Sequence, residues 1–251
     1  MTKQKGIEVS IVIPTLNEGR GLARTLRHLT ILEPPVKEII IVDGGSTDDT
    51  VTIARSTPLP TPVAILHSKQ ARRSTQMNLG AKYASGDILC FVHGDTLVPD
   101  DLVRMVAATL EDSKIAGGGF ISLMTGQTTR WSTSLHNTLK TYYAPLFFRP
   151  FSFFKGLRVL FGDQAIFCRR QDFLDCGGFD SSLSIMEEAD LCIRLSRKGR
   201  IKQVNRVVFS SDRRVAKWGA IRANFIYLAI GSLWGVGVSD KTLKEFYEDI
   251  R

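Results

Sequence analysis

The sequence predicts an α/β fold in which a mostly parallel central sheet carries helices on both faces. In residues 9–112, short runs rich in Ile and Val alternate with segments of helical periodicity, which is typical of successive β-α-β units. These runs are continuously apolar rather than alternating with polar residues, as expected for strands that are buried on both sides. Polar clusters follow several of the predicted strands, where parallel sheets bind their ligands.

The first half of the chain contains four predicted strands, each followed by a predicted helix. Leu22, Leu26 and Leu29 recur at helical spacing in the first helix. Ser46 is expected to cap the second helix, whose first turn contains acidic residues, and Pro99 stands at the start of the fourth. The strands are expected at 9–15, 37–45, 63–68 and 87–92, and the helices at 19–31, 46–56, 71–86 and 99–112.

The second half is less regular. Strands are expected at 117–123, 164–170 and 201–211, a helix at 185–200 and an amphipathic helical tail at 216–251. The stretch between Arg130 and Asp163 is aromatic and basic, and its pattern assigns it to no element.

Composition narrows the possible functions. The chain has 251 residues, of which 43% are hydrophobic, so it can bury a core and is neither disordered nor fibrous. A formal net charge of +8 indicates an anionic partner, such as a phosphorylated substrate, a nucleic acid or an anionic lipid surface. The four cysteines form no CxxC pair, which favours a reducing, cytosolic compartment. The longest apolar run, 225–238, is shorter than the roughly 20 residues that span a bilayer.

Asp95 is the first candidate ligand. The run "DILCFV", residues 87–92, is followed directly by His93, Gly94 and Asp95. A carboxylate is a hard oxygen ligand that suits Mg²⁺ or Mn²⁺ held together with phosphate oxygens. An isolated Asp after a strand is equally compatible with a turn or a helix cap.

Two further polar clusters follow the first and second predicted strands. Asp43 in "DGGSTDDT" could accept hydrogen bonds from a base or a ribose, and the two glycines after it allow another group to approach the backbone closely. "PTLNE", residues 14–18, is either a helix start or a polar ligand contact. A simple strand-to-helix turn is the alternative in both places.

Basic residues lie between the third and fourth predicted strands. Arginine is suited to bidentate phosphate contact, although a solvated helix face is the alternative. The candidates in this stretch are Lys69, Arg72, Arg73, Gln76 and Asn78.

Acidic residues later in the chain are candidates for a general base. Glu187, Glu188 and Asp190 stand at one helix start, where they either stabilise the helix dipole or raise one another's pKa. One of them could then take a proton from a hydroxyl. Asp163, in "FGDQAIF", is a further acid whose alternative is a turn residue.

Taken in order, these pieces resemble a family 2 glycosyltransferase with the GT-A fold. The resemblance runs from about residue 8 to 210 and is closest to small, single-domain bacterial members. The pieces that carry it are "VSIVIPTLNE", "EIIIVDGGSTDDT", "QMNLGAKYASGDILCFVHGDT", "FGDQAIFCRR", "CGGFD" and "MEEADLCIRLSRKGR".

The resemblance implies one domain over 1–215, with a donor-binding half at about 8–115 and an acceptor and catalytic half at about 116–215. The tail, 216–251, would pack on the same domain or on a membrane surface. The residues implied to bind the nucleotide-sugar donor are Pro14, Thr15, Asn17, Glu18, Asp43, Gly45, Ser46, Arg73, Gln76, Asn78 and Asp95.

The implied reaction is inverting transfer of a sugar from a nucleotide-diphosphate-sugar to an acceptor hydroxyl. Uridine is the commonest base in the family, and a lipid-linked acceptor is one alternative. Asp95 stands in the position that holds a divalent cation, Mg²⁺ or Mn²⁺, on the diphosphate. Glu188 stands in the position of the base and Glu187 precedes it.

Two residues depart from the family pattern. His93 stands where the family has an acid, so it is either an additional metal ligand or leaves Asp95 to bind with water. The base position holds Glu188 rather than Asp, which leaves open a share in the role for Asp190 or Asp163.

Two other function classes compete with this interpretation. One is a nucleotidyltransferase that makes nucleotide-sugars, but "PTLNEGRG" fits poorly to its glycine-rich basic loop. The other is a non-catalytic binder of nucleic acid or anionic membrane, because basic and aromatic residues interleave in 142–158. No nucleic-acid-binding motif accompanies them, so no nucleic acid is expected. The expected location is cytoplasmic, with peripheral contact at the inner face of the membrane as an alternative.

Overall fold

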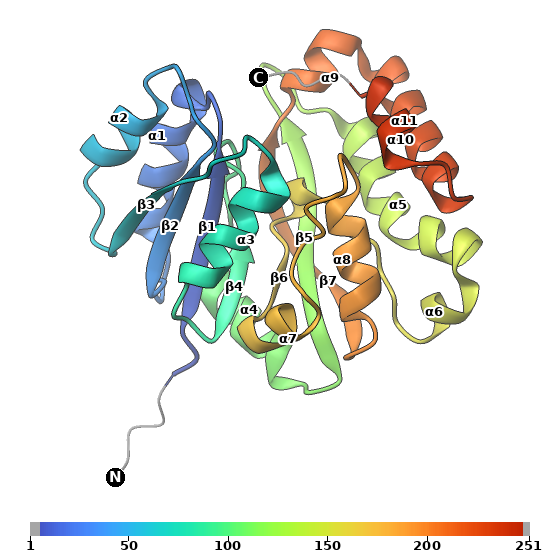
Figure 1. Cartoon of the computed structure of the whole chain (residues 1–251), viewed down its shortest axis with the longest axis horizontal. Helices are drawn as coiled ribbons and strands as arrows, with labels where there is room; N and C mark the ends of the chain where they lie inside the picture. The colour runs from blue at the N-terminus through green and yellow to red at the C-terminus, as the bar shows by residue number, and fades with distance from the viewer. Residues whose placement is uncertain (1–5, 248–251) are drawn as a thin grey trace.

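A single mixed sheet forms the centre of the computed structural model, which describes residues 6–247 (Figure 1). Its strand order is β3-β2-β1-β4-β6-β5-β7. Only β6 runs antiparallel to its neighbours, β4 and β5. The strands are β1 (Val9–Thr15), β2 (Glu38–Asp43), β3 (Val63–His67), β4 (Ile88–Phe91), β5 (Ile115–Thr125), β6 (Phe167–Arg169) and β7 (Arg200–Ser211).

Helices connect and cover these strands. The α-helices are α1 (Gly19–His28), α2 (Thr50–Ser56), α3 (Arg73–Tyr83), α4 (Leu102–Glu111), α5 (Trp131–Phe148), α6 (Pro150–Phe154), α7 (Arg170–Asp175), α8 (Glu187–Leu195), α9 (Arg213–Trp218), α10 (Ala220–Gly235) and α11 (Asp240–Glu245). Two short 3₁₀ helices, η1 (Leu29–Ile31) and η2 (Gly162–Gln164), lie between them. The predicted α/β fold with a mostly parallel sheet is confirmed.

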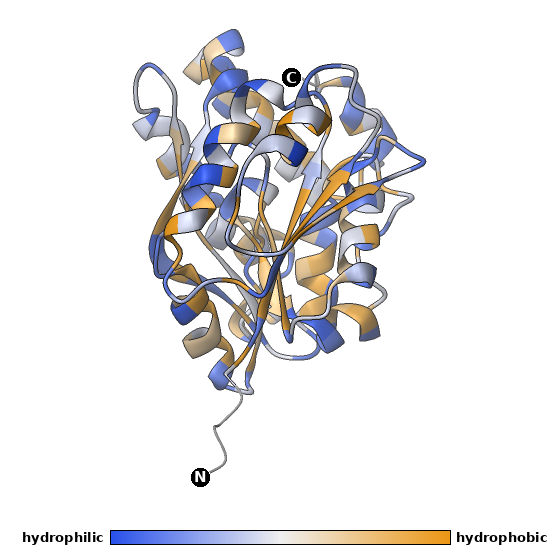
Figure 2. Ribbon diagram, turned by 90° about the vertical axis from the view of Figure 1, so that its left-hand side faces the viewer, coloured by the Kyte–Doolittle hydropathy of each residue, from blue (hydrophilic) through white to orange (hydrophobic). Residues whose placement is uncertain are grey.

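The sheet is buried on both faces, as its continuous apolar strands predict. Side chains alternate along β1, so that Ile11 and Ile13 join the core under α1 and α4, whereas Val12 joins the core under α3 and α8. The central strands β1, β2 and β4 are apolar along most of their length, whereas the edge strand β7 is exposed at many positions. Figure 2 shows hydrophobic strands in the middle of the molecule. The polar ends of β1, β2 and β4 are thereby held at one edge of a rigid sheet.

The structure corrects one local prediction. The second helix begins at Thr50 rather than at residue 46, and Ser46 does not cap it. Instead the Ser46 hydroxyl donates a hydrogen bond to Asp43 at 2.5 Å. The acids that precede Thr50 thus belong to the loop between β2 and α2, where Asp43 accepts hydrogen bonds from Gly45 and Ser46 and Asp48 accepts one from the backbone N–H of Thr50.

The tail packs on the rest of the chain within the described residues. The helix α10 packs against α5, and α9 and α11 pack in turn against α10 (Figure 1). Trp218 and Val215 join Met124 of β5 and Ala223 of α10 in a small apolar cluster. Residues 248–251, the end of the expected tail, lie outside the described residues, as do residues 1–5. Within the described part of the chain, no helix is long and apolar enough to cross a membrane.

Candidate active site

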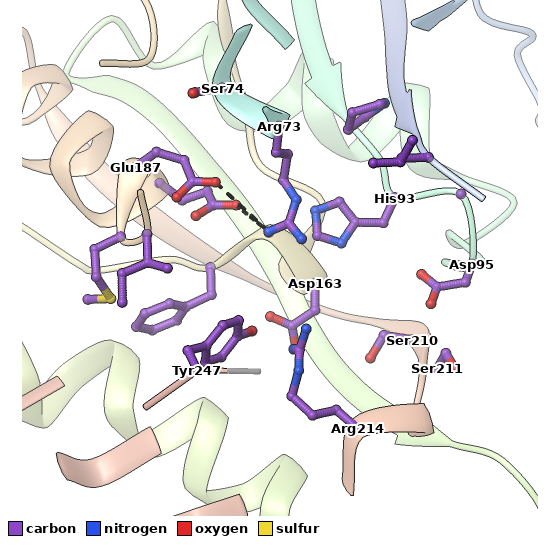
Figure 3. A pocket seen from close by; sticks show the side chains of 18 of the residues that line it. Arg73, Ser74, His93, Asp95, Asp163, Glu187, Ser210, Ser211, Arg214 and Tyr247 are labelled. Atoms are coloured by element: carbon purple, nitrogen blue, oxygen red, sulfur yellow. Dashed lines mark ion pairs between the residues drawn. The ribbon is translucent and has the colours of Figure 1, made fainter. Parts of the chain in front are cut away.

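A cavity of about 440 Å³ opens at the carboxyl edge of the sheet (Figure 3). Its walls come from the ends of β1, β4 and β7, from η2 and α8, and from α5, α10 and the segment after α11. The predicted site residues that line it are Pro14, Thr15, Glu18, Arg73, Gln76, His93, Asp95, Asp163, Glu187 and Glu188.

Arg213 joins two carboxylates at one end of this cavity. Its Nη2 donates to Oε2 of Glu18 and to Oδ2 of Asp95, each at 2.7 Å. Burial and the neighbouring Asp95 raise the pKa of Glu18. The guanidinium therefore balances two acids that come from the ends of β1 and β4.

His93 and Glu188 face each other across a residue without a side chain. A methyl group on Gly162 would overlap with Nε2 of His93 and would lie 2.6 Å from Oε1 of Glu188. Both of these atoms are buried, and neither has a hydrogen-bond partner. Burial and the nearby Arg73 lower the pKa of His93 to about 3, so its ring is neutral near pH 7.

Glu188 has the electrostatics of a general base. Burial, followed by repulsion from Glu187, raises its pKa to about 8. Arg73 lies between Glu187 and His93 in Figure 3, and its Nη1 is 3.6 Å from Oε1 of Glu188 and 3.9 Å from Oε1 of Glu187. A carboxyl group held in this way can accept a proton near neutral pH.

A buried lysine stands in the wall formed by α5. Lys140 is 7% exposed, and its Nζ lies 3.6 Å from the centre of the Phe161 ring. Burial lowers its pKa to about 8, although Asp163 and Glu188 act in the opposite direction. Asp163 accepts a hydrogen bond from Asn137 at 2.7 Å. This part of the cavity therefore combines a cation, a carboxylate and an amide.

The C-terminal segments add a further basic side chain, Arg214, which has aromatic neighbours. The guanidinium carbon of Arg214 is 4.3 Å from the centre of the Tyr247 ring, and its Nε is buried without a hydrogen-bond partner. Burial raises the pKa of Tyr227, which also lines the cavity. In Figure 3, Arg214 and Asp163 point toward each other across the pocket.

Some predicted donor-binding residues serve to fix the loops. Gln76 donates to the carbonyls of Thr15 and Val42, each at 2.7 Å, and so ties the ends of β1 and β2 together. Asn17 accepts a hydrogen bond from the backbone N–H of Thr47 at 2.9 Å.

Asp43 fixes its own turn in the same way. Its carboxylate accepts hydrogen bonds from the backbone N–H groups of Gly45 and Ser46. Neither Asn17, Asp43, Gly45 nor Ser46 lines the cavity. Their implied contact with a base stays a prediction.

Asn78 and Asp190 also lie outside the cavity lining. The Asn78 side chain exchanges hydrogen bonds with the backbone of Phe179, at 2.8 Å in each direction, and so fixes the loop after α7. Asp190 forms an ion pair with Arg194 one turn further along α8, at 2.6 Å. Of the predicted acids on α8, only Glu187 and Glu188 face the pocket.

The donor set suits a cation that is shared with a ligand. The described residues contain no cluster of three His, Cys, Asp or Glu side chains that could hold a metal by themselves. Glu18 and Asp95 nevertheless place two hard oxygens around one positive group, Arg213. Mg²⁺ is commonly held by one or two carboxylates together with substrate phosphates. Nε2 of His93 faces Gly162 and Glu188 instead.

The sequence interpretation missed several cavity residues. Lys140, Arg213, Arg214, Tyr227 and Tyr247 all line the pocket. One signal was available, because the polar cluster "DRR", residues 212–214, comes directly after the last predicted strand, as the other polar clusters come after theirs. Tyr227 belongs to α10 and Tyr247 follows α11, and the sequence pattern does not reveal how these segments pack.

A family model and several relatives match this chain. The model of glycosyl transferase family 2 matches residues 10–177. An uncharacterized protein of Mycobacterium tuberculosis is 24% identical over 202 residues, which cover 77% of this chain and 63% of that protein. The uncharacterized glycosyltransferase YibD of Escherichia coli is 33% identical over 107 residues, which cover 42% of this chain and 31% of that protein. The chain thus spans less than two thirds of these relatives.

Solved structures share the fold. A mannosyltransferase of Pyrobaculum calidifontis, in complex with GDP-Man and Mn²⁺, superposes with a TM-score of 0.70 at 18% identity over 97% of this chain and 68% of that one. Glucosyl-3-phosphoglycerate synthase of Mycobacterium tuberculosis, with Mn²⁺, UDP and its product, gives a TM-score of 0.62 at 20% identity over 94% of this chain and 82% of that one. The fold is that of the GT-A glycosyltransferases.

Proposed function

Because the chain belongs to glycosyl transferase family 2, we propose that it transfers a sugar with inversion from a UDP-linked donor to the hydroxyl of a lipid-linked acceptor. The observation that carries the proposal is the cavity itself. Its one end holds Glu18, Asp95 and Arg213, and its wall holds the buried Glu188, whose pKa is raised to about 8.

The finer parts of the proposal draw on relatives. UDP is bound in the structures of glucosyl-3-phosphoglycerate synthase and of TarS from Staphylococcus aureus. An undecaprenyl-phosphate 4-deoxy-4-formamido-L-arabinose transferase of Sodalis glossinidius is 28% identical over 123 residues, which cover 46% of this chain and 38% of that protein. The UDP complexes support a uridine-linked donor, and the similarity to the undecaprenyl-phosphate transferase supports a lipid-linked acceptor.

In the proposed reaction, Glu188 accepts the proton of the acceptor hydroxyl. The acceptor oxygen attacks the anomeric carbon from the side opposite the diphosphate, and the bond between that carbon and the diphosphate oxygen breaks. The diphosphate leaves with the electron pair. Arg73, Arg213 and Arg214, which line the cavity, stabilise its negative charge. Glu187 favours the protonated form of Glu188 and so strengthens it as a base.

Asp95 and Glu18 are the residues that would hold a divalent cation, Mg²⁺ or Mn²⁺, together with oxygens of the donor. Such a cation neutralises charge on the diphosphate leaving group. The Mn²⁺ bound in the two GT-A neighbours supports this assignment. A role for His93 as a further ligand stays a prediction.

The test is donor turnover with defined nucleotide-sugars. Purified protein is incubated with UDP-glucose, UDP-N-acetylglucosamine or GDP-mannose in the presence of Mn²⁺, and release of the nucleoside diphosphate is followed. A metal-dependent release or thermal shift with a UDP-sugar is expected. The proposal is overturned if no donor gives either signal. Release of pyrophosphate from a sugar phosphate and a nucleoside triphosphate would indicate a nucleotidyltransferase instead.

A further inference from the structure

The helix α5 has its polar and apolar faces in an unusual arrangement. A helix on the surface of a water-soluble protein normally turns its apolar stripe inward and its polar side chains outward. In α5 the residues that are buried include Thr133, Ser134, Asn137, Lys140 and Thr141. Polar side chains therefore line its inner face, where Asn137 and Lys140 reach the cavity.

The opposite side of α5 is apolar and exposed. Its exposed residues are Trp131, Leu135, Leu139, Tyr142 and Leu146, spaced three or four residues apart as required for a single face. Trp131 is 71% exposed. A stripe of this kind is costly in water, because it leaves apolar area in contact with solvent that burial would remove.

The helix α10 repeats the pattern beside α5. Ile221, Phe225 and Leu228 form its exposed stripe, with Ile221 90% exposed. Its other side carries Tyr227 and Ile230, which line the cavity. Both helices thus form the cavity wall with one side and an apolar outer surface with the other.

The short helix α6, which comes directly after α5, extends this surface. Phe151 is 86% and Phe154 is 79% exposed. We define the outer face by the exposed apolar residues of the three helices, namely Trp131, Leu135, Leu139, Tyr142, Leu146, Phe147, Phe151, Phe154, Ile221, Phe225 and Leu228.

The charged residues around the outer face indicate what kind of partner would bind it. Residues 131–158 and 220–235, which contain the three helices, include no Asp or Glu. Their exposed charged residues are Arg149, Lys155 and Arg222, all of them basic. Apolar side chains mixed with basic ones are the composition of helices that lie in the interface of an anionic bilayer. A protein partner would need a dedicated patch of acidic and apolar groups to match this face. An anionic bilayer presents negatively charged headgroups and apolar chains over its whole surface.

We propose that the outer face docks on an anionic lipid bilayer, as found on the cytoplasmic side of membranes. The aromatic and aliphatic side chains enter the headgroup region, and Arg149, Lys155 and Arg222 contact lipid phosphates. The proposal extends the proposed function and rests on it in one respect, because the helices that meet the lipid also form the wall that would receive a lipid-linked acceptor.

Vesicle flotation tests the docking surface. The whole protein is mixed with vesicles of phosphatidylcholine alone or of phosphatidylcholine and phosphatidylglycerol in roughly a 2:1 ratio, and the floated fraction is measured. Wild-type protein is expected to bind the anionic vesicles at least about tenfold more tightly than vesicles of phosphatidylcholine alone. The double variants Phe151→Ser/Phe154→Ser and Ile221→Ser/Phe225→Ser are expected to lose at least tenfold of that binding. Arg149→Gln/Lys155→Gln is expected to lose the preference for anionic lipid.

A matched control uses exposed apolar residues elsewhere. Ile31 and Tyr83 are 53% and 57% exposed and lie outside the outer face, so Ile31→Ser/Tyr83→Ser is expected to float like wild type. The proposal is overturned if wild type does not float, or if the face variants float as well as the control. It is also overturned if light scattering shows a dimer that the same variants dissociate, because a second copy would then cover the face.

Donor turnover separates this proposal from the function. The face variants keep Glu188, Asp95 and the cavity lining, so donor hydrolysis and metal-dependent thermal shift are expected to match wild type. Lost flotation with retained turnover supports the docking surface, whereas absent turnover in wild type overturns only the proposed function.

Discussion

The cavity has two halves that treat their polar side chains differently. In the half beside β1, β2 and α3, the Gln76 side chain donates a hydrogen bond to the carbonyl of Thr15. Asn17 and Asp43, which lie outside the cavity lining, accept hydrogen bonds from backbone N–H groups of the loop after β2. In the half around η2 and α8, Oε1 of Glu188 and Nε2 of His93 are buried without a hydrogen-bond partner, although Oε1 lies 3.6 Å from Nη1 of Arg73. Buried polar groups are normally satisfied, and the exceptions concentrate where a ligand or a reaction supplies the missing partner. Gln76, Asn17 and Asp43 therefore act as a scaffold, and the half around η2 and α8 is the place where proton transfer is expected.

Replacement of Glu188 gives the largest expected effect. Glu188→Gln removes the proposed base but keeps the shape of the side chain, so sugar transfer should fall by about 10²–10⁴-fold. Donor binding, measured by thermal shift with nucleotide and Mn²⁺, should stay within about twofold of wild type. Full turnover in this variant would show that Glu188 is not the base and would make Asp163 the candidate. It would also contradict the difference between the two halves.

Replacement of Gln76 tests the scaffold half. Gln76→Leu removes two hydrogen bonds to the carbonyls of Thr15 and Val42, in a side chain that is 3% exposed. The free energy of unfolding should fall by about 1–3 kcal/mol, as measured by urea denaturation. The rate constant for transfer at saturating donor should change far less than it does in Glu188→Gln. A large loss of rate without a loss of stability would give Gln76 a direct role.

The pH dependence of transfer should report the raised pKa of Glu188. A general base works only in its deprotonated form, and burial raises this pKa to about 8. Below pH 8 the deprotonated fraction falls about tenfold per pH unit, so the rate should rise from pH 6 to pH 8 and then level off. A rate that is constant between pH 5 and pH 8 would exclude a base with this pKa.

The smallest effect is expected at Asp190, three residues after Glu187 on the same helix. Its ion pair with Arg194 is partly exposed and faces away from the cavity lining. Asp190→Asn should change the free energy of unfolding by less than about 1 kcal/mol and leave transfer unchanged. Loss of transfer in this variant would show that the cavity extends further along α8 than the lining residues indicate.

Local pattern was sufficient to predict the scaffold half. Continuous apolar runs predict β1, β2 and β4, and parallel strands bring their ends to one edge whichever segments connect them. Glu18 and Asp95, which follow β1 and β4, accordingly line the cavity, and their implied contact with a donor stays a prediction. The role of a residue could not be predicted without knowing its hydrogen-bond partners. The sequence does not reveal, for example, that backbone N–H groups of the following turn donate to the Asp43 carboxylate.

The other half depends on contacts between distant segments. Arg213 meets Asp95 across 118 residues, a separation that no local pattern reports. The helix α5 was missed because its apolar residues lie outside and its polar residues inside, and because it contains Pro145. Periodicity predicts a helix with a buried apolar face, so a helix with the opposite arrangement gives no clear signal.

The bare backbone at Gly162 has an evolutionary consequence. A single added methyl group would displace the ring of His93 and the carboxyl of Glu188 together. Positions 93, 162 and 188 are therefore expected to covary among relatives, so that a larger residue at 162 appears only where a smaller one replaces His93 or Glu188. In relatives where Glu188 is the residue replaced, the proton acceptor would have to come from another position, and these alignment columns would mark a change of reaction chemistry.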